Sequence, residues 1–239
     1  MIATIPHPLL RRSTDRGRSD YGWLDSRHSF SFGEYADPKW DGFSDLRALN
    51  ESRIAPGQGF DMHAHRDMEM LTWVLEGNVQ HRDSLGNDRP LHRGEIQLMT
   101  AGSGIRHGLS NASGSEDVRY LHFWILPQSR DVATSYEQKA VPPELLRNQL
   151  GLVAAPKEEG GIVTLDQDAR IFIGRLDKGA RLPYTISENR AAWIQLARGR
   201  LQVNDVGLLA GDGVGLRTAQ SLELEALDPC EVLVFDLRG

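Results

Sequence analysis

The sequence is poor in cysteine, in long apolar runs and in basic charge. Its 239 residues include one cysteine, Cys230, so no internal disulfide can form, which fits a reducing compartment. No apolar run reaches the ~20 residues of a transmembrane helix, and the N-terminus lacks the apolar core of a secretory signal. The net charge of −6 argues against a nucleic-acid-binding surface. We therefore expect a cytoplasmic protein that binds neither membranes nor nucleic acids.

Basic residues are concentrated in one place only, close to the N-terminus. The residues are Arg11, Arg12, Arg16 and Arg18. A charged terminal segment of this kind is most often solvated. We therefore expect a solvent-exposed tail here.

Helix patterns are also scarce, whereas strand patterns recur along the whole chain. The 24 glycines and 11 prolines favour many turns and short strands. One short helix is expected over Pro142–Leu150, because proline starts it and Gly151 follows its end. Apolar or alternating segments predict strands. These segments are Met68–Leu75, Val79–Asp83, Glu95–Thr100, Val118–Leu126, Leu222–Leu227 and Glu231–Leu237. The patterns predict an all-β chain with few short helices.

The chain is long enough for two domains of about 120 residues. The loop composition of residues 154–161 places a boundary nearby, and we expect a first β-barrel over residues 1–130. Residues 131–239 would form a linker and a second barrel. Leu71–Gly77 resembles Trp193–Gly199, each an apolar strand ending at glycine, which favours a duplication. The candidates for filling the second barrel or the junction between barrels are Trp193, Ile194, Leu196 and Phe235.

All eight histidines lie within the first 122 residues, so a histidine-built site belongs to the first barrel. His63 and His65 are two residues apart, and such residues point to the same side of a strand. His107, which follows a glycine-rich segment, is the natural third ligand. Three imidazoles suit iron, copper, nickel or zinc and leave positions open for a substrate or dioxygen. Glu69 shares the parity of His63 and would also face inward if the strand continued regularly.

The remaining candidates have structural interpretations. His122 lies beside Phe123 and Trp124 in a strand and is expected in the core or in a pocket wall. His81 and His92 flank a polar hairpin and are expected to be solvated. For His28 we expect a structural hydrogen bond, and for Cys230 a buried, unreactive thiol.

The spacing of these residues resembles the two motifs of the cupin family. The first segment is Gly57-x5-His63-x-His65-x3-Glu69-x7-Gly77, and the second is Gly94-x7-Gly102-x4-His107-x3-Asn111. Several longer segments look like the pirin family of two-domain cupins. They are Tyr21–Phe32, Pro56–Phe60, His63–Glu69, Val74–Gly77 and Met99–His107.

The pirin resemblance implies two jelly-roll barrels in tandem. The first barrel would bind one divalent metal through His63, His65 and His107, and the second would lack metal ligands. The resemblance implies iron as the metal, with copper, nickel, cobalt, manganese or zinc as alternatives.

Leu109 departs from the pirin pattern, in which a glutamate ligand stands two residues after the third histidine. By strand parity Leu109 lies on the same side as His107 but offers no lone pair. Three outcomes are open: three histidines with water, Glu69 as a fourth ligand, or a weak or empty site.

The resemblance also implies an activity. Some bacterial pirin-like proteins open the heterocyclic ring of quercetin with dioxygen, so we expect a dioxygenase that acts on quercetin or a related enolic aromatic. The partners would be a small aromatic substrate and dioxygen, and Glu69 would be the base. The alternatives are a regulatory protein that binds a protein partner and depends on its metal, or a catalytically degenerate relative. We expect a monomer.

Overall fold

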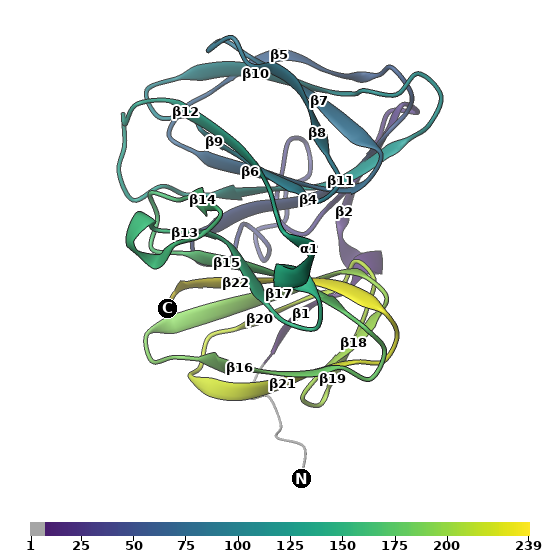
Figure 1. The fold of residues 1–239 in the computed structure, drawn as a ribbon, viewed down its shortest axis with the longest axis vertical. Coiled ribbons are helices and arrows are strands. Elements are labelled where there is room, and N and C mark those ends of the chain that lie inside the picture. The colour runs from purple at the N-terminus through teal and green to yellow at the C-terminus, as the bar shows by residue number, and fades with distance from the viewer. Residues whose placement is uncertain (1–7) are drawn as a thin grey trace.

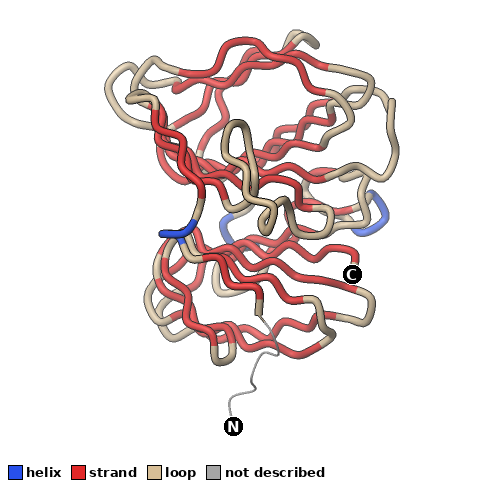
Figure 2. Tube along the Cα trace, turned by 180° about the vertical axis from the view of Figure 1, so that it is seen from behind, coloured by secondary structure: helices blue, strands red, loops and turns tan. Residues whose placement is uncertain are grey.

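The computed structural model describes residues 8–239 as two β-barrels stacked one on the other (Figure 1). Each barrel combines a seven-stranded sheet with a four-stranded sheet. Strands dominate the chain, and the helices of the described part are short (Figure 2). They are α1 (Pro143–Leu146) and two 3-10 turns, Ser13–Asp15 and Lys157–Glu159. The prediction of an all-β fold with two barrels in tandem is confirmed.

The first barrel is built from eleven strands in two sheets. In spatial order, the large sheet contains β12 (Ser135–Ala140), β9 (Glu95–Thr100), β6 (Glu69–Glu76), β11 (Val118–Ile125), β4 (Leu46–Ile54), β3 (Leu24–His28) and β2 (Gly17–Asp20). The small sheet contains β5 (Gly59–His65), β10 (Ile105–Asn111), β7 (Asn78–Asp83) and β8 (Asp88–His92).

The second barrel repeats this arrangement. Its large sheet contains β1 (Leu9–Arg11), β20 (Gly213–Leu216), β17 (Arg190–Arg198), β22 (Cys230–Arg238), β15 (Arg170–Leu176), β13 (Gly151–Ala155) and β14 (Val163–Thr164). Its small sheet contains β16 (Arg181–Ile186), β21 (Gln220–Ala226), β18 (Arg200–Val203) and β19 (Val206–Leu209). The predicted equivalence of Leu71–Gly77 and Trp193–Gly199 agrees with this order, because β6 and β17 hold the same position in their sheets.

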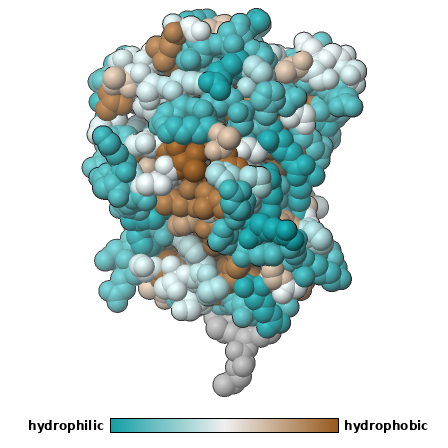
Figure 3. All heavy atoms as spheres, in the orientation of Figure 1, coloured by the Kyte–Doolittle hydropathy of each residue, from teal (hydrophilic) through white to brown (hydrophobic). Residues whose placement is uncertain are grey.

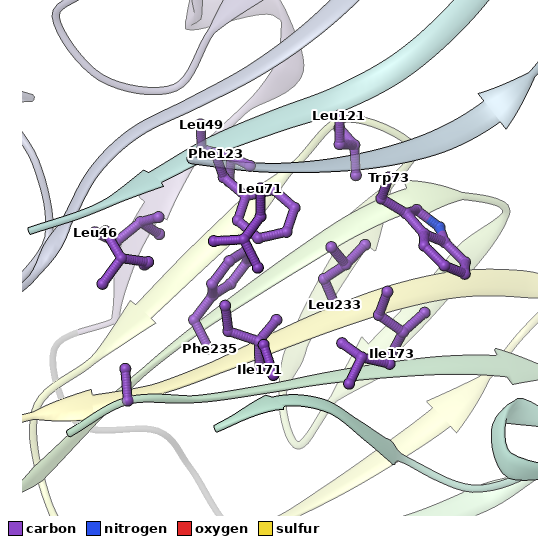
Figure 4. Packing of buried hydrophobic residues seen from close by; sticks show 14 of the residues in the cluster. Leu46, Leu49, Leu71, Trp73, Leu121, Phe123, Ile171, Ile173, Leu233 and Phe235 are labelled. Carbon is purple, nitrogen blue, oxygen red and sulfur yellow. The ribbon is translucent and has the colours of Figure 1, made fainter. Parts of the chain in front are cut away.

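The two large sheets pack face to face and form the main hydrophobic core. Leu71 and Phe123 of the first barrel lie against Ile171 and Phe235 of the second (Figure 4). Each such side chain contributes roughly 1.5–3 kcal/mol when it is fully buried. The residues predicted to fill the second barrel or the junction between barrels lie in two different cores, because successive residues of a strand face opposite sides of the sheet. Trp193 and Phe235 belong to this junction core, whereas Ile194 and Leu196 fill the second barrel.

The sheets cross the expected boundary at residue 130 in both directions. Strand β12 follows that boundary but pairs with β9 of the first barrel. Strand β1 precedes it but pairs with β20 of the second barrel. Each barrel is therefore completed by a strand from the other part of the sequence, which ties the two together.

The expected solvated arginine tail is wrong for two of its residues. The side chain of Arg11 is buried, and its Nε donates to the carbonyl oxygen of Ser29 at 3.1 Å. The side chain of Arg16 is also buried and forms an ion pair with Glu51 at 2.9 Å. Once β1 joins the second barrel, the residues after it have to run along the junction, where a charged side chain needs a partner.

The helix predicted over Pro142–Leu150 is shorter in the structure, where only α1 forms. It ends at Leu146 because Arg147 is extended and Asn148 has a positive φ of 52°. Among the described residues, no helix is long and apolar enough to cross a membrane. The face seen in Figure 3 is mainly hydrophilic, and its apolar residues gather near the level at which the barrels meet.

Candidate metal centre

Two strands of the small sheet bring three histidines together in the first barrel. His63 and His65 lie on β5, and His107 lies on β10, where the register places it opposite His63. The ring centroids are 4.7 Å apart for His63 and His107, 4.8 Å for His63 and His65, and 5.0 Å for His65 and His107. One ring nitrogen from each residue lies within 4.8 Å of the others. Nitrogens bonded to one ion at ~2.1 Å are at most ~4.2 Å apart, so small side-chain adjustments suffice.

The hydrogen bonds of these imidazoles leave nitrogens available for a metal. His63 Nδ1 donates to the carbonyl oxygen of Asp61 at 2.7 Å, which leaves the lone pair on Nε2. The buried atoms His65 Nε2 and His107 Nδ1 have no hydrogen-bond partner among the described residues. Buried polar nitrogens without a partner are costly unless something else binds them. The three residues therefore fit a divalent transition metal.

Burial keeps the imidazoles of His65 and His107 neutral, as metal ligands must be. It lowers the pKa of His65 to about 4, and the neighbouring His63 contributes in the same direction. Burial also lowers the pKa of His107 to about 2, with smaller contributions from the surrounding histidines. Both rings therefore present lone pairs at neutral pH.

The histidines open onto a cavity of about 330 Å³ between the small and large sheets of the first barrel. Aromatic side chains form much of its wall, including Phe32, Phe60 and Trp124. Trp124 meets the His65 ring edge-on at 5.0 Å and the Phe32 ring at 5.0 Å. The cavity therefore offers flat apolar contacts directly beside the imidazoles.

Leu109 lines the same cavity as His107, as strand parity predicts. Its side chain is almost fully buried and packs with Ile54, Val74 and Val79. The position that follows the third histidine by two residues therefore presents a hydrocarbon surface to the site.

The structure does not bring Glu69 to the histidines. Strand β5 ends at His65, the chain turns through Asp67 with φ 49°, and Glu69 begins β6 in the other sheet. Its carboxylate accepts backbone N–H bonds from Asp166 at 2.8 Å and Gln167 at 3.2 Å. Burial raises the pKa of Glu69 to about 7. Glu69 thus lies at the junction between barrels, outside the cavity, with both oxygens occupied.

Two of the other histidines are placed as expected. His122 lines the cavity, and its Nδ1 lies 3.1 Å from Thr72 Oγ1. His28 is buried and hydrogen-bonded to Asn50 at 2.7 Å. His7 lies outside the described residues. The thiol of Cys230 is buried, as expected, and burial raises its pKa to about 11, which disfavours the reactive thiolate.

The expectation that His81 is solvated is wrong, whereas His92 is exposed as expected. His81 is fully buried, with Nε2 2.9 Å from Asp83 and Nδ1 3.1 Å from Gln97. His81 lies on β7, whose alternate residues face the barrel interior. Because the residues next to it in the sequence are polar, this alternation was not visible as a change from polar to apolar residues.

The sequence interpretation missed the polar floor of the cavity. Asn50 and Ser52 alternate with outward-facing residues along β4 and line the cavity together with His122. The alternation of Ala48, Asn50, Ser52 and Ile54 was the available signal, since polar residues occupy two positions of an otherwise apolar face.

The second barrel holds no equivalent centre among its described residues. Strands β16 and β21 occupy the sheet positions of β5 and β10. Their inward side chains are apolar or aromatic and pack into the core of this barrel. They are Leu182, Tyr184, Leu222 and Leu224.

The buried histidines predict an acid-sensitive metal-free protein. The pKa is lowered, first by burial, for His28, His65, His81, His107 and His122. Free imidazoles titrate near pH 6.5, so below that pH the unfolded chain binds more protons than the folded one. The free energy of unfolding should therefore fall by at least ~2 kcal/mol from pH 7 to pH 5.

Glu69 acts in the opposite direction, because its raised pKa favours the folded state as its carboxyl takes up a proton. One carboxyl does not offset five imidazoles. Urea unfolding of chelator-treated protein would check this, and a free energy that stays constant or rises toward pH 5 would contradict it.

Two stacked jelly-roll barrels, with three histidines converging inside the first, define a tandem cupin. The pirin family model matches residues 10–125, and a model described as the quercetinase C-terminal cupin domain matches residues 152–237. The quercetin 2,3-dioxygenase of Escherichia coli strain K12 is 39% identical over 228 residues, covering 95% of this chain and 97% of that protein. The chain belongs to the pirin family.

Solved structures agree with this assignment. The crystal structure of YhhW from Escherichia coli superposes with a TM-score of 0.92 at 38% identity, covering 97% of each chain. A structure of the bacterial pirin YhhW in complex with nickel(II) gives a TM-score of 0.91 at 38% identity, covering 97% of this chain and 99% of that chain. The predicted family and fold are confirmed.

Proposed function

We propose that this chain is a metal-dependent dioxygenase that acts on quercetin or a related enolic aromatic, with iron as its metal. The observation that carries the proposal is the cluster of His63, His65 and His107, whose unpartnered nitrogens lie beside an aromatic-walled cavity of about 330 Å³. The activity named for the Escherichia coli relative supports the same substrate class.

The cavity suits a flat ligand. The small sheet carries the histidines on one side, and the large sheet provides hydrogen-bonding groups on the other. Phe32 and Trp124 stand edge to face at 5.0 Å and would contact an aromatic ring through offset or edge-on packing. These contacts would orient the ligand and exclude water from its apolar part.

His63, His65 and His107 would hold the metal. When bound there, the metal supplies a Lewis acid and a template that brings an enolic substrate and dioxygen together. Leu109 supplies no ligand and packs beside His107, so its side chain keeps water away from this side of the site. Three protein ligands leave coordination positions for the reactants.

The proton of an enolic hydroxyl needs an acceptor other than Glu69, since both oxygens of that carboxylate accept backbone N–H bonds outside the cavity. Of the described residues that line the cavity, Glu34 is the one with a carboxylate side chain. It is exposed in a turn closed by backbone bonds between Phe32 and Tyr35 at 2.9 and 3.0 Å. We assign the proton-accepting role to Glu34, at the edge of the cavity.

Metal reconstitution tests this function. Chelator-treated protein would be loaded separately with iron(II), copper, nickel, cobalt, manganese or zinc, and oxygen uptake and quercetin consumption would be measured. The expected result is turnover that depends on metal and is fastest with iron. Metal binding without oxygen uptake would refute the dioxygenase and favour a metal-dependent binding protein. Turnover that is faster with another metal would refute only the choice of iron.

A further inference from the structure

A row of polar side chains crosses the cavity floor, perpendicular to the strands of the large sheet. The register places His28 opposite Asn50, Asn50 opposite His122, and His122 opposite Thr72. Directly opposite residues on one face of a sheet lie about 4.5–5.5 Å apart, so their polar groups are in reach of one another. His28, Asn50 and His122 all line the cavity. The row therefore forms a hydrogen-bonding surface facing the histidine cluster across the cavity.

The hydrogen bonds within this row fix the orientation of the Asn50 amide. His28 Nδ1 donates to Asn50 Oδ1 at 2.7 Å. Ser19 Oγ lies 2.9 Å from His28 Nε2 and donates to it, since that nitrogen carries the lone pair in this tautomer. Phe32 stacks on the His28 ring with centroids 5.4 Å apart. Ser19 and Phe32 thus fix the position of the His28 imidazole, and the imidazole fixes the position of the Asn50 amide oxygen.

This arrangement leaves the amide nitrogen of Asn50 for a ligand. Among the described residues, the side-chain hydrogen bond of Asn50 is the one that its Oδ1 accepts from His28, and the Nδ2 group is not used in it. The Asn50 side chain is 3% exposed, so a ligand in the cavity is the acceptor available to it. A ligand that fills the cavity would remove water from this amide, and a donor then left without an acceptor costs about 1–3 kcal/mol, so a ligand that lacks an oxygen here is disfavoured.

We propose that Asn50 is a specificity-determining residue that donates a hydrogen bond to a ligand oxygen remote from the metal-binding end. His28 and Ser19 are its positioning residues. The inference rests on the proposed function for the class of ligand, an oxygen-substituted aromatic. The neighbouring His122 offers a second polar contact, because Thr72 occupies its Nδ1 and leaves Nε2.

Ligand binding without turnover tests this role. The iron(II)-loaded protein would be titrated anaerobically with quercetin and with 3-hydroxyflavone, which keeps the metal-binding oxygens but lacks the other hydroxyl groups. The measured quantity is the ratio of the two dissociation constants. We expect the natural protein to prefer quercetin by about tenfold, the size of one well-formed hydrogen bond.

Two substitutions at Asn50 remove the donor in different ways. Asn50→Asp keeps the shape and the oxygen that accepts from His28 but has no N–H, and Asn50→Leu removes both polar groups. Each should reduce the preference to about twofold or less, with unchanged metal content. The control is Asn78→Leu, since Asn78 forms a similar bond to His92 at 2.9 Å on the exposed side of the barrel. It should leave the ratio unchanged.

The outcomes separate the inference from the function. If the Asn50 substitutions caused only a structural defect, binding of both flavonols would weaken equally and the ratio of their dissociation constants would stay the same. That result would overturn the role of Asn50. Equal affinities in the natural protein, or no binding of either flavonol, would overturn it as well. Oxygen uptake with quercetin is measured separately, so a preference that depends on Asn50 without turnover would support the inference and refute the dioxygenase.

Discussion

Replacing His63 or His107 by alanine should abolish stoichiometric metal binding. Each change leaves two imidazoles, and nothing else in the cluster can replace the lost nitrogen, because Leu109 is a hydrocarbon and Glu69 lies outside the cavity. Affinity should fall by more than ~100-fold, since changing residues that only orient metal ligands already costs about 10–100-fold. Metal content after equilibrium dialysis, measured by elemental analysis, would show the loss.

The two substitutions differ in their structural cost, which makes the result interpretable. The His63 side chain is exposed, whereas His107 is 2% exposed within the barrel. His63→Ala should therefore keep the unfolding midpoint of the metal-free protein, so that its loss of metal cannot be attributed to misfolding. His92→Ala, on the exposed side of the barrel, is the matched control and should bind metal normally. Near-stoichiometric metal in both cluster variants would refute the assigned centre.

Strand parity was enough to predict the neighbouring histidines but not the carboxylate. His63 and His65 lie on one continuous strand, so their relation depends only on the period of two. Glu69 was expected to continue that strand. The turn at Asp67 instead starts β6 in another sheet, where Glu69 faces backbone N–H groups 97 and 98 residues further along the chain. No local pattern reports such a distant partner.

The same limit explains the other differences. His81 and Arg16 are polar residues beside polar neighbours, which locally indicates solvent exposure. In the fold, Asp83 and Gln97 surround His81, and Glu51 pairs with Arg16. Burial of a polar group becomes favourable only once its partners are present, and sheet assembly supplies them. The cavity floor through Asn50 likewise depends on the register of three strands.

Leu109→Glu should make the stability of the protein strongly dependent on metal. In the metal-free variant the new carboxylate would lie among Ile54, Val74 and Val79, which pack against Leu109. Burying a carboxylate in apolar surroundings is unfavourable, and we expect a loss of about 2–4 kcal/mol in the free energy of unfolding. Unfolding in denaturant with a chelator present would measure this loss.

Metal should reverse that loss. Leu109 lines the cavity on the same side of β10 as His107, so a glutamate there can reach an ion held by the three histidines. Its negative charge would act on the cation in a weakly screened interior. A ligand that binds only the folded state stabilises it according to its affinity, so 100-fold tighter binding adds about 2.7 kcal/mol at a fixed excess of metal. The metal-induced rise in unfolding midpoint should therefore be larger in the variant than in the natural protein.

Two further variants separate charge from shape. Leu109→Gln has the length of glutamate without its charge, and should be destabilised in metal-free form but gain little from metal. Leu109→Met preserves volume and should cost less than ~1.5 kcal/mol, with a metal response like that of the natural protein. Equal metal-induced shifts in the glutamate variant and the natural protein would show that a carboxylate at residue 109 does not reach the ion. Three histidines, with water or substrate, would then be the complete ligand set that this cavity can provide.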